Sequence, residues 1–130
     1  MDMNRDSCGG CTANMVLIVE NEIYIANAGD SRSIIYTGNP NQISFNENLG
    51  GKYSTVTQLS NDHKPEVESE RERIYNAGGA IFNGRVNGNL NLTRALGDFE
   101  CKSDKNYARD AQLIVATPEI TRHTIKVRLN

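Results

Sequence analysis

The sequence contains no tryptophan and no long apolar run. Its longest such run, residues 15–19, is far shorter than the roughly 20 residues that a membrane-spanning helix needs, so we expect no membrane partner. There is also no basic excess, because 14 lysines and arginines stand against 16 aspartates and glutamates, a net charge of −2. Proteins that bind nucleic acid phosphates carry basic surfaces, so the sequence predicts no nucleic acid partner either.

Cysteine is scarce. The three cysteines, Cys8, Cys11 and Cys101, cannot all pair within the chain, which favours a reducing compartment over a disulfide-stapled scaffold. The first ten residues also lack the charged and then apolar layout of a secretory signal. We therefore expect a cytoplasmic or nuclear protein.

The composition fits one modest globular domain. The 130 residues are 38% hydrophobic and 23% charged, which allows one core and little more. Short apolar and β-branched runs separated by turn residues predict strands at 12–19, 22–27, 33–37, 55–59, 80–82, 84–86, 113–116 and 119–129. The first three predict a meander. The unbroken apolar character of residues 15–19 is typical of a strand that is covered on both faces.

One helix is strongly indicated over residues 65–77. Pro65 suits the first helical position, and Gly78 with Gly79 provides a left-handed stop. A narrow apolar stripe would face the protein (Val67, Ile74 and Ala77). The charged side chains would then face water (Glu68, Arg71, Glu72 and Arg73).

The remaining segments predict loops and one smaller element. Residues 38–54 are rich in asparagine and glycine, which predicts a surface loop. Residues 90–96 predict a short helix that ends at Gly97, and the polar residues 100–112 predict an exposed flap.

Cys8 and Cys11 form the first candidate site. Their spacing could serve a redox dithiol or half of a zinc site. A dithiol requires a helix directly after the pair, whereas residue 12 onward predicts a strand. Zinc would need further ligands, and the available ones have no paired spacing (Cys101, His63 and His123). A glycine turn that leads into a strand is the simpler interpretation.

Asp30 is the second candidate, in the run Ala-Gly-Asp-Ser-Arg that ends an apolar strand. A carboxylate in a tight turn can bind a hard cation, because the adjacent glycine admits close approach; an ordinary aspartate turn is the alternative. Arg85 and Arg94 form the third candidate. Each lies near glycine turns and could meet phosphate oxygens or clamp loop carbonyls and carboxylates.

Seven segments taken together resemble the metal-dependent protein serine/threonine phosphatases of the 2C type. They follow one another in the order of that family and extend from about residue 10 to residue 120. They are Gly-Cys-Thr-Ala at 10–13, Ile-Ala-Asn-Ala-Gly-Asp-Ser-Arg at 25–32, Leu-Ser-Asn-Asp-His-Lys-Pro at 59–65, Arg-Ile-Tyr-Asn-Ala-Gly-Gly at 73–79, residues 84–90, Thr-Arg-Ala-Leu-Gly-Asp-Phe at 93–99 and Thr-Pro-Glu-Ile at 117–120.

The resemblance implies an α+β fold and an enzyme. The fold is a four-layer α/β/β/α sandwich of two antiparallel sheets, of which this chain would form the central part. The implied activity is hydrolysis of phosphoserine and phosphothreonine in protein substrates by a water that Mg²⁺ or Mn²⁺ activates, with no phosphoenzyme.

The resemblance also assigns roles to residues. Asp30 matches the aspartate that helps to hold an accessory metal ion, and Thr12 matches a threonine close to it. Arg94 and Asp98 lie in the segment that leads into the flap beside the substrate cleft. The motif residues expected to be mainly structural are Asp62, His63, Arg85 and Asn87.

The departures from the family pattern limit the prediction. The upstream Asp-Gly-His-Gly-Gly motif, the arginine before it and the later Asp-Gly-Ile/Leu-Trp-Asp and Asp-Asn motifs do not occur in this sequence. A divalent ion takes about six oxygen ligands, so Asp30 alone cannot build a two-metal centre. We therefore predict that residues 1–130 are an incomplete catalytic domain with exposed apolar faces, inactive in isolation. The alternatives are a non-catalytic module that binds phosphoproteins or other partners, and a thiol redox module.

Overall fold

A computed structural model describes residues 9–38 and 55–125 of the chain. Three predictions fall wholly or partly outside these ranges. They concern Cys8, residues 39–54 of the expected surface loop, and the last strand beyond residue 125.

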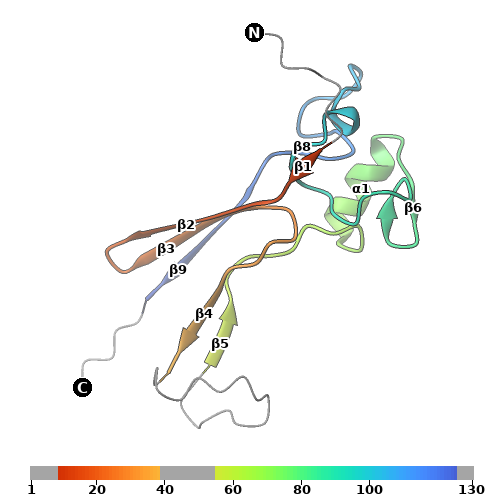
Figure 1. The fold of residues 1–130 in the computed structure, drawn as a ribbon. Coiled ribbons are helices and arrows are strands. Elements are labelled where there is room, and N and C mark those ends of the chain that lie inside the picture. The colour runs from red at the N-terminus through yellow and green to blue at the C-terminus, as the bar shows by residue number, and fades with distance from the viewer. Residues whose placement is uncertain (1–8, 39–54, 126–130) are drawn as a thin grey trace.

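A three-stranded antiparallel sheet, in the order β2-β3-β9, forms one arm of the molecule (Figure 1). It contains β2 (Ala13–Val19), β3 (Glu22–Ala28) and β9 (Glu119–Thr124). Ile25 of the central strand β3 faces Val16 on one side and Thr121 on the other. Ile23 and Ile25 are buried while Tyr24 and Ala26 are only partly buried, the alternation expected of a strand with one face on a core.

The predicted meander is wrong in its third strand. β4 (Ile34–Thr37) does not join β3 but pairs with β5 (Thr55–Gln58) in a separate two-stranded sheet. The second edge of β3 is instead occupied by β9, almost one hundred residues later in the chain. The chain leaves the first sheet at Gly29, whose carbonyl accepts the backbone N–H of His63 at 3.0 Å.

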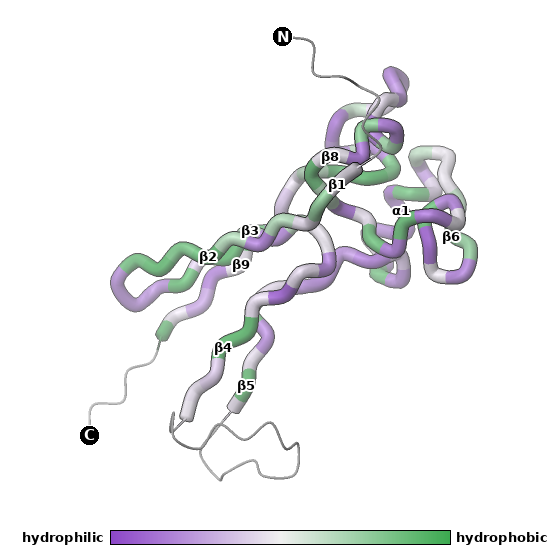
Figure 2. Tube along the Cα trace, viewed as in Figure 1, coloured by the Kyte–Doolittle hydropathy of each residue, from purple (hydrophilic) through white to green (hydrophobic). Residues whose placement is uncertain are grey.

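Strand β2 is exposed on both faces, contrary to the prediction that it is covered. Met15 is 70% exposed and Leu17 58% on one face, while Ile18 is 61% exposed on the other. The apolar run shows as a continuous green segment of the tube in Figure 2. This agrees with the expectation of exposed apolar faces on this chain.

Helix α1 (Glu68–Asn76) is shorter at its start than predicted. Pro65 lies before the helix and is buried, and Val67, in an extended conformation, is the N-cap residue. The predicted stop is confirmed, because Gly78 adopts a φ of +75° and the Gly79 N–H returns to the Ile74 carbonyl at 2.9 Å. No helix in the described ranges is both long and apolar enough to cross a membrane.

The hairpin of β6 (Ile81–Phe82) and β7 (Arg85–Val86) is also confirmed. Its two turn residues, Asn83 and Gly84, have φ values of 51° and 71°, as a tight hairpin turn requires. The predicted helix at 90–96 is wrong. That segment contains no helix; it makes isolated bridges from Leu90 to Val86 and from Arg94 to Val115, and it ends in β8 (Leu96–Gly97), which pairs with β1 (Gly10–Cys11).

Two small apolar clusters form the core. One lies under α1 and contains Ile74, Val86, Ala95 and Ile114. The other lies between the two sheets and contains Ile23, Ile25 and Leu59. The predicted strand at 113–116 is reduced to a single parallel bridge between Val115 and Arg94, beside the first cluster.

Candidate functional site

Asp30 occupies a turn at the end of β3, where its carboxylate remains one-quarter exposed. The Nζ atom of Lys64 lies 3.8 Å from Asp30 Oδ2, at the outer limit of an ion pair. The turn depends on Gly29, which adopts a φ of +115°. A Cβ atom there would lie 2.3 Å from Cγ2 of Thr12, so the close approach needs glycine.

Thr12 therefore lies directly beside the turn of Asp30. Its Oγ1 atom is 2.6 Å from Oγ of Ser31, the residue after Asp30. The structure brings Thr12 and Asp30 together from two neighbouring strand ends, β2 and β3.

The same turn is tied to the segment 61–63. The amide of Asn27 donates to the Gly29 carbonyl at 3.0 Å and to the Asn61 carbonyl at 2.7 Å. His63 contacts Gly29 through its backbone N–H and through Nδ1 of its ring, 3.2 Å from the Gly29 nitrogen. Burial, with the positive charge of Arg94, lowers the pKa of His63, so its imidazole is neutral at neutral pH.

Asp62 forms a two-pronged ion pair with Arg32, with N···O distances of 3.1 and 2.8 Å. The hydrogen bonds from Arg32 lower the pKa of Asp62. The Arg32 side chain is 53% exposed, so solvent screens the pair and its contribution to stability is small. Asp62 and His63 thus both link the segment 61–63 to the turn that carries Asp30.

Helix α1 carries a buried carboxylate that the sequence pattern did not single out. Glu70, on α1, is 1% exposed and accepts hydrogen bonds from Arg94 at 2.5 Å, Thr93 at 2.6 Å and Arg73 at 2.8 Å. Arg73 was predicted to face water, and that prediction is wrong. Its guanidinium also donates to the carbonyls of Gln112 and Thr93, so its charge is fully engaged.

The ionisation of Glu70 is coupled to folding. Burial opposes its charge, but the hydrogen bonds from Arg94, Thr93 and Arg73 outweigh it and lower the pKa to about 2 from 4.5. A carboxylate whose pKa is lower in the folded state adds stability above the unfolded pKa, and this stability is lost as the pH falls.

We therefore expect the free energy of unfolding to decrease as the pH is lowered from 4.5 towards 2, by up to about 3 kcal/mol from this group. Urea unfolding at a series of acidic pH values measures the loss. In parallel, the carboxyl carbon chemical shift of Glu70 should titrate far below the ordinary glutamate value of 4.5. A Glu70 that titrates near 4.5 contradicts the prediction.

The family resemblance assigns both Arg94 and Asp98 to the approach to the flap, but the two side chains make different contacts. Arg94 is committed to Glu70 and to the Thr117 carbonyl at 3.1 Å. Asp98 has a φ of 48° and starts the short 3-10 helix η2 (Phe99–Lys102). Its carboxylate lies against Gly10, where a Cβ atom would approach Oδ2 to 2.2 Å. Asp98 therefore sits over the β1-β8 pair.

Arg85 and Asn87 make contacts within their own hairpin. Arg85 donates to the Asn89 carbonyl at 2.7 Å, and Asn87 Oδ1 accepts the N–H of Ala80 at 2.9 Å. Of the two readings that the sequence left open for Arg85, the contact with a loop carbonyl is the one present in the structure.

The sequence model described as Protein phosphatase 2C matches residues 1–128. The chain belongs to the protein phosphatase 2C family. It is 46% identical over 117 residues to Probable protein phosphatase 2C 3 of Paramecium tetraurelia, and 47% identical over 119 residues to Probable protein phosphatase 2C 11 of Oryza sativa subsp. japonica. These matches cover 90% and 92% of this chain but only 34% and 28% of the relatives.

Solved structures confirm the predicted α+β sandwich class. A phosphatase from a pathogenic strain of Toxoplasma gondii superposes with a TM-score of 0.64 at 30% identity, covering 80% of this chain and 28% of that one. A C. elegans sex-determining protein superposes with a TM-score of 0.66 at 30% identity, covering 92% of this chain and 25% of that one. The chain therefore spans about a third of the length of the curated relatives it matches.

Metal dependence is implied by the 2C family, and the described residues fit it only in part. Asp30 offers one accessible carboxylate, a suitable hard ligand. Within residues 9–38 and 55–125, however, no three histidine, cysteine, aspartate or glutamate side chains come together in a way that could hold an ion. A complete metal centre is not present among them, and we derive no catalytic step through one.

The thiol and zinc hypothesis gains no support from the positions of its residues. Cys11 is exposed and Cys101 is partly buried, and neither forms a disulfide. Burial raises the pKa of Cys101, which makes its thiol less reactive. The two histidines face backbone groups of Gly29 and Leu59.

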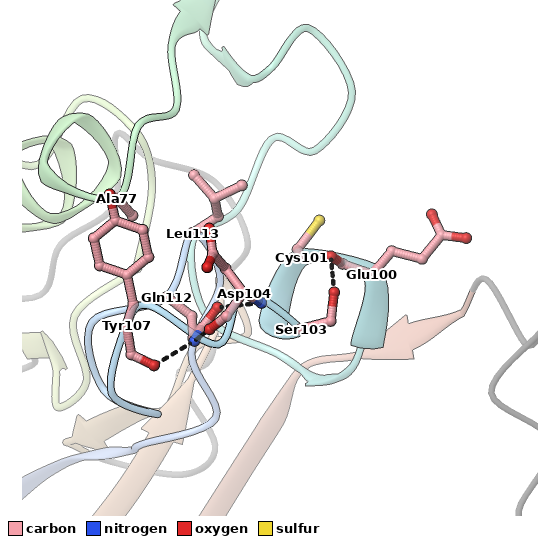
Figure 3. A pocket seen from close by; sticks show the side chains of 8 residues that line it. All are labelled: Ala77, Glu100, Cys101, Ser103, Asp104, Tyr107, Gln112 and Leu113. Carbon is pink, nitrogen blue, oxygen red and sulfur yellow. Dashed lines mark hydrogen bonds between the residues drawn. The ribbon is translucent and has the colours of Figure 1, made fainter.

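The flap of this 2C-family chain forms one wall of a cavity of about 350 Å³ (Figure 3). Tyr107 extends towards Ala77 at the end of α1, and Cys101 lines the cavity from η2. The flap was predicted to be exposed, and most of it is. Gln112 is the exception at 4% exposed, because its amide holds the loop through the carbonyls of Asp104 and Tyr107 at 2.7 and 2.8 Å.

Proposed function

We propose that this chain is part of a protein serine/threonine phosphatase that hydrolyses phosphoserine and phosphothreonine by means of a metal-activated water. The match of the 2C family over residues 1–128 carries the proposal, since it includes every segment in which the sequence resembles that family. The cations would be Mg²⁺ or Mn²⁺, and the substrates phosphorylated proteins.

Asp30 is the residue we propose as a ligand of an accessory ion, with Thr12 beside it. The support is local: a partly exposed carboxylate stands on a turn with glycine at φ +115° and is only weakly paired with Lys64. We further propose that Arg94 and Asp98 act at the approach to the flap, Arg94 by holding Glu70 and Asp98 by starting η2.

The isolated 130-residue chain is proposed to be inactive. A two-metal phosphatase needs several carboxylates around its cations, and Asp30 is one. We expect that purified chain with Mn²⁺ does not dephosphorylate a phosphothreonine peptide above the rate of its Asp30→Asn variant. Calorimetry should show no pair of tightly bound Mn²⁺ ions.

The outcome of that assay separates the candidate functions. Turnover at a rate comparable to full-length relatives, abolished by Asp30→Asn, would overturn the proposed inactivity. Saturable binding of the same phosphopeptide without turnover would favour the non-catalytic binding module instead.

A further inference from the structure

The hydrogen bonds around Gly29 determine how the turn carrying Asp30 is held. The Gly29 carbonyl accepts two N–H groups at 3.0 Å, one from the backbone of His63 and one from the amide of Asn27. Two donors satisfy both lone pairs of a carbonyl oxygen. The Gly29 N–H is also buried, and its acceptor in the described part of the chain is Nδ1 of His63 at 3.2 Å.

The ring nitrogen Nδ1 lies 3.2 Å from both the nitrogen and the oxygen of Gly29, so two tautomers of His63 are conceivable. A proton on Nδ1 would give the carbonyl a third donor and would leave the buried N–H of Gly29 without an acceptor. Leaving a buried donor without an acceptor is unfavourable, because the group has lost its hydrogen bonds to water without replacement. A lone pair on Nδ1 gives the Gly29 N–H its acceptor and leaves the Gly29 carbonyl with its two donors, and the proton then resides on Nε2.

Glu119 faces that second nitrogen. Nε2 of His63 is buried without a hydrogen-bond partner in the described residues, and Oε2 of Glu119 lies 3.6 Å away. The carboxylate is held in place by the amide of Asn61, at 3.3 and 3.2 Å from its two oxygens. A negative charge here attracts a protonated Nε2 and repels a lone pair.

We propose that His63 is a positioning residue for Asp30, whose Nδ1 atom accepts the Gly29 N–H, and that Glu119 stabilises the Nε2-protonated tautomer on which this contact depends. The inference rests on the proposed role of Asp30. Hydrogen bonds hold both the N–H and the carbonyl of Gly29, so they fix the orientation of the peptide that joins Gly29 to Asp30. That orientation sets the direction of the Asp30 side chain.

Nuclear magnetic resonance of the ¹⁵N-labelled chain tests the tautomer directly. We expect the Nδ1 resonance of His63 at the position of an unprotonated nitrogen and Nε2 at that of a protonated one, with a scalar coupling between Nδ1 and the Gly29 amide nitrogen. The chain has two histidines, so His123 serves as an internal reference. A proton on Nδ1 of His63 overturns the proposal.

Substitution of Glu119 tests the positioning. In Glu119→Ala the Gly29 amide should exchange with solvent about tenfold faster or more, and the Asp30 amide resonance should shift. Glu119→Gln keeps the shape of the side chain but removes its negative charge, so it should change Gly29 exchange in the same direction as Glu119→Ala. Lys64→Gln changes the ion pair of Asp30 but not the ring, and should leave the tautomer unchanged. Unchanged Gly29 exchange in Glu119→Ala overturns the role of Glu119. None of these measurements requires a cation or a phosphate. A failure of the positioning proposal can therefore be distinguished from a failure of the proposed function.

Discussion

Glu70→Ala should abolish the cooperative unfolding transition of this chain. The substitution leaves the guanidinium groups of Arg73 and Arg94, 13% and 19% exposed, without their shared buried carboxylate, and the hydroxyl of Thr93 loses its acceptor. Removing one partner of a buried ion pair costs about 3–5 kcal/mol. That is a large share of the roughly 5–15 kcal/mol that stabilises a typical domain.

Glu68→Ala is the matched control for Glu70→Ala, because it removes a glutamate from the same helix that pairs with Arg71 at the surface. The Glu68 side chain is 69% exposed, so its loss should cost less than about 1 kcal/mol. Urea unfolding followed by circular dichroism measures both variants. If the two lose similar stability, Glu70 is not the central contact that the structure indicates.

Gly29→Ala should be the second most damaging substitution. An alanine would have to adopt a φ of +115°, and its Cβ would meet Cγ2 of Thr12 at 2.3 Å and the carbonyl oxygen of Arg94 at 2.9 Å. The unfavourable backbone conformation costs about 1–2 kcal/mol and overpacking about 1–3 kcal/mol, so the sum should be about 2–5 kcal/mol.

Two further variants separate the causes of the Gly29→Ala effect. Gly84→Ala adds a Cβ at a φ of +71° with no atom within 4 Å, so it should show the backbone cost alone, about 1–2 kcal/mol. Thr12→Ser removes Cγ2 and should restore part of the stability lost in Gly29→Ala. Equal losses in Gly29→Ala and Gly84→Ala would show that Thr12 and Arg94 yield without cost. Thermal unfolding of wild type, Gly29→Ala, Gly84→Ala and the double variant Gly29→Ala with Thr12→Ser provides the comparison.

Local signals in the sequence predicted local structure well. The Asn83-Gly84 pair predicted its hairpin, and Gly78 predicted the end of α1, because both depend on backbone conformations that few residues adopt. The start of α1 was misplaced because Pro65, suited to a first helical turn, instead occupies a buried position before the helix.

Long-range pairing was not predictable from the local pattern. β9 pairs with β3 almost one hundred residues away, and the segment expected as a helix at 90–96 instead bridges to Val115 through Arg94. Both depend on partners that no local window of sequence contains.

The residues of the candidate site likewise fall into those that were predicted and one that was missed. The neighbourhood of Thr12 and Asp30 followed from the family resemblance, not from spacing. Glu70 was missed because charged residues on a helix usually face solvent. Its signal was the spacing to Arg73, three residues on and one helical turn away, which makes an intrahelical pair possible.

The segment 61–63 joins the two apolar clusters described above. On the side of the sheets, the Asn61 carbonyl accepts a hydrogen bond from the side-chain amide of Asn27. On the side of α1, the His63 carbonyl accepts a hydrogen bond from the backbone N–H of Thr93 at 3.0 Å. Among the described residues, each cluster contains only three or four buried side chains, too few to be stable by itself. The stabilities of the two clusters therefore depend on each other. Opening the segment 61–63 would unfold both clusters together.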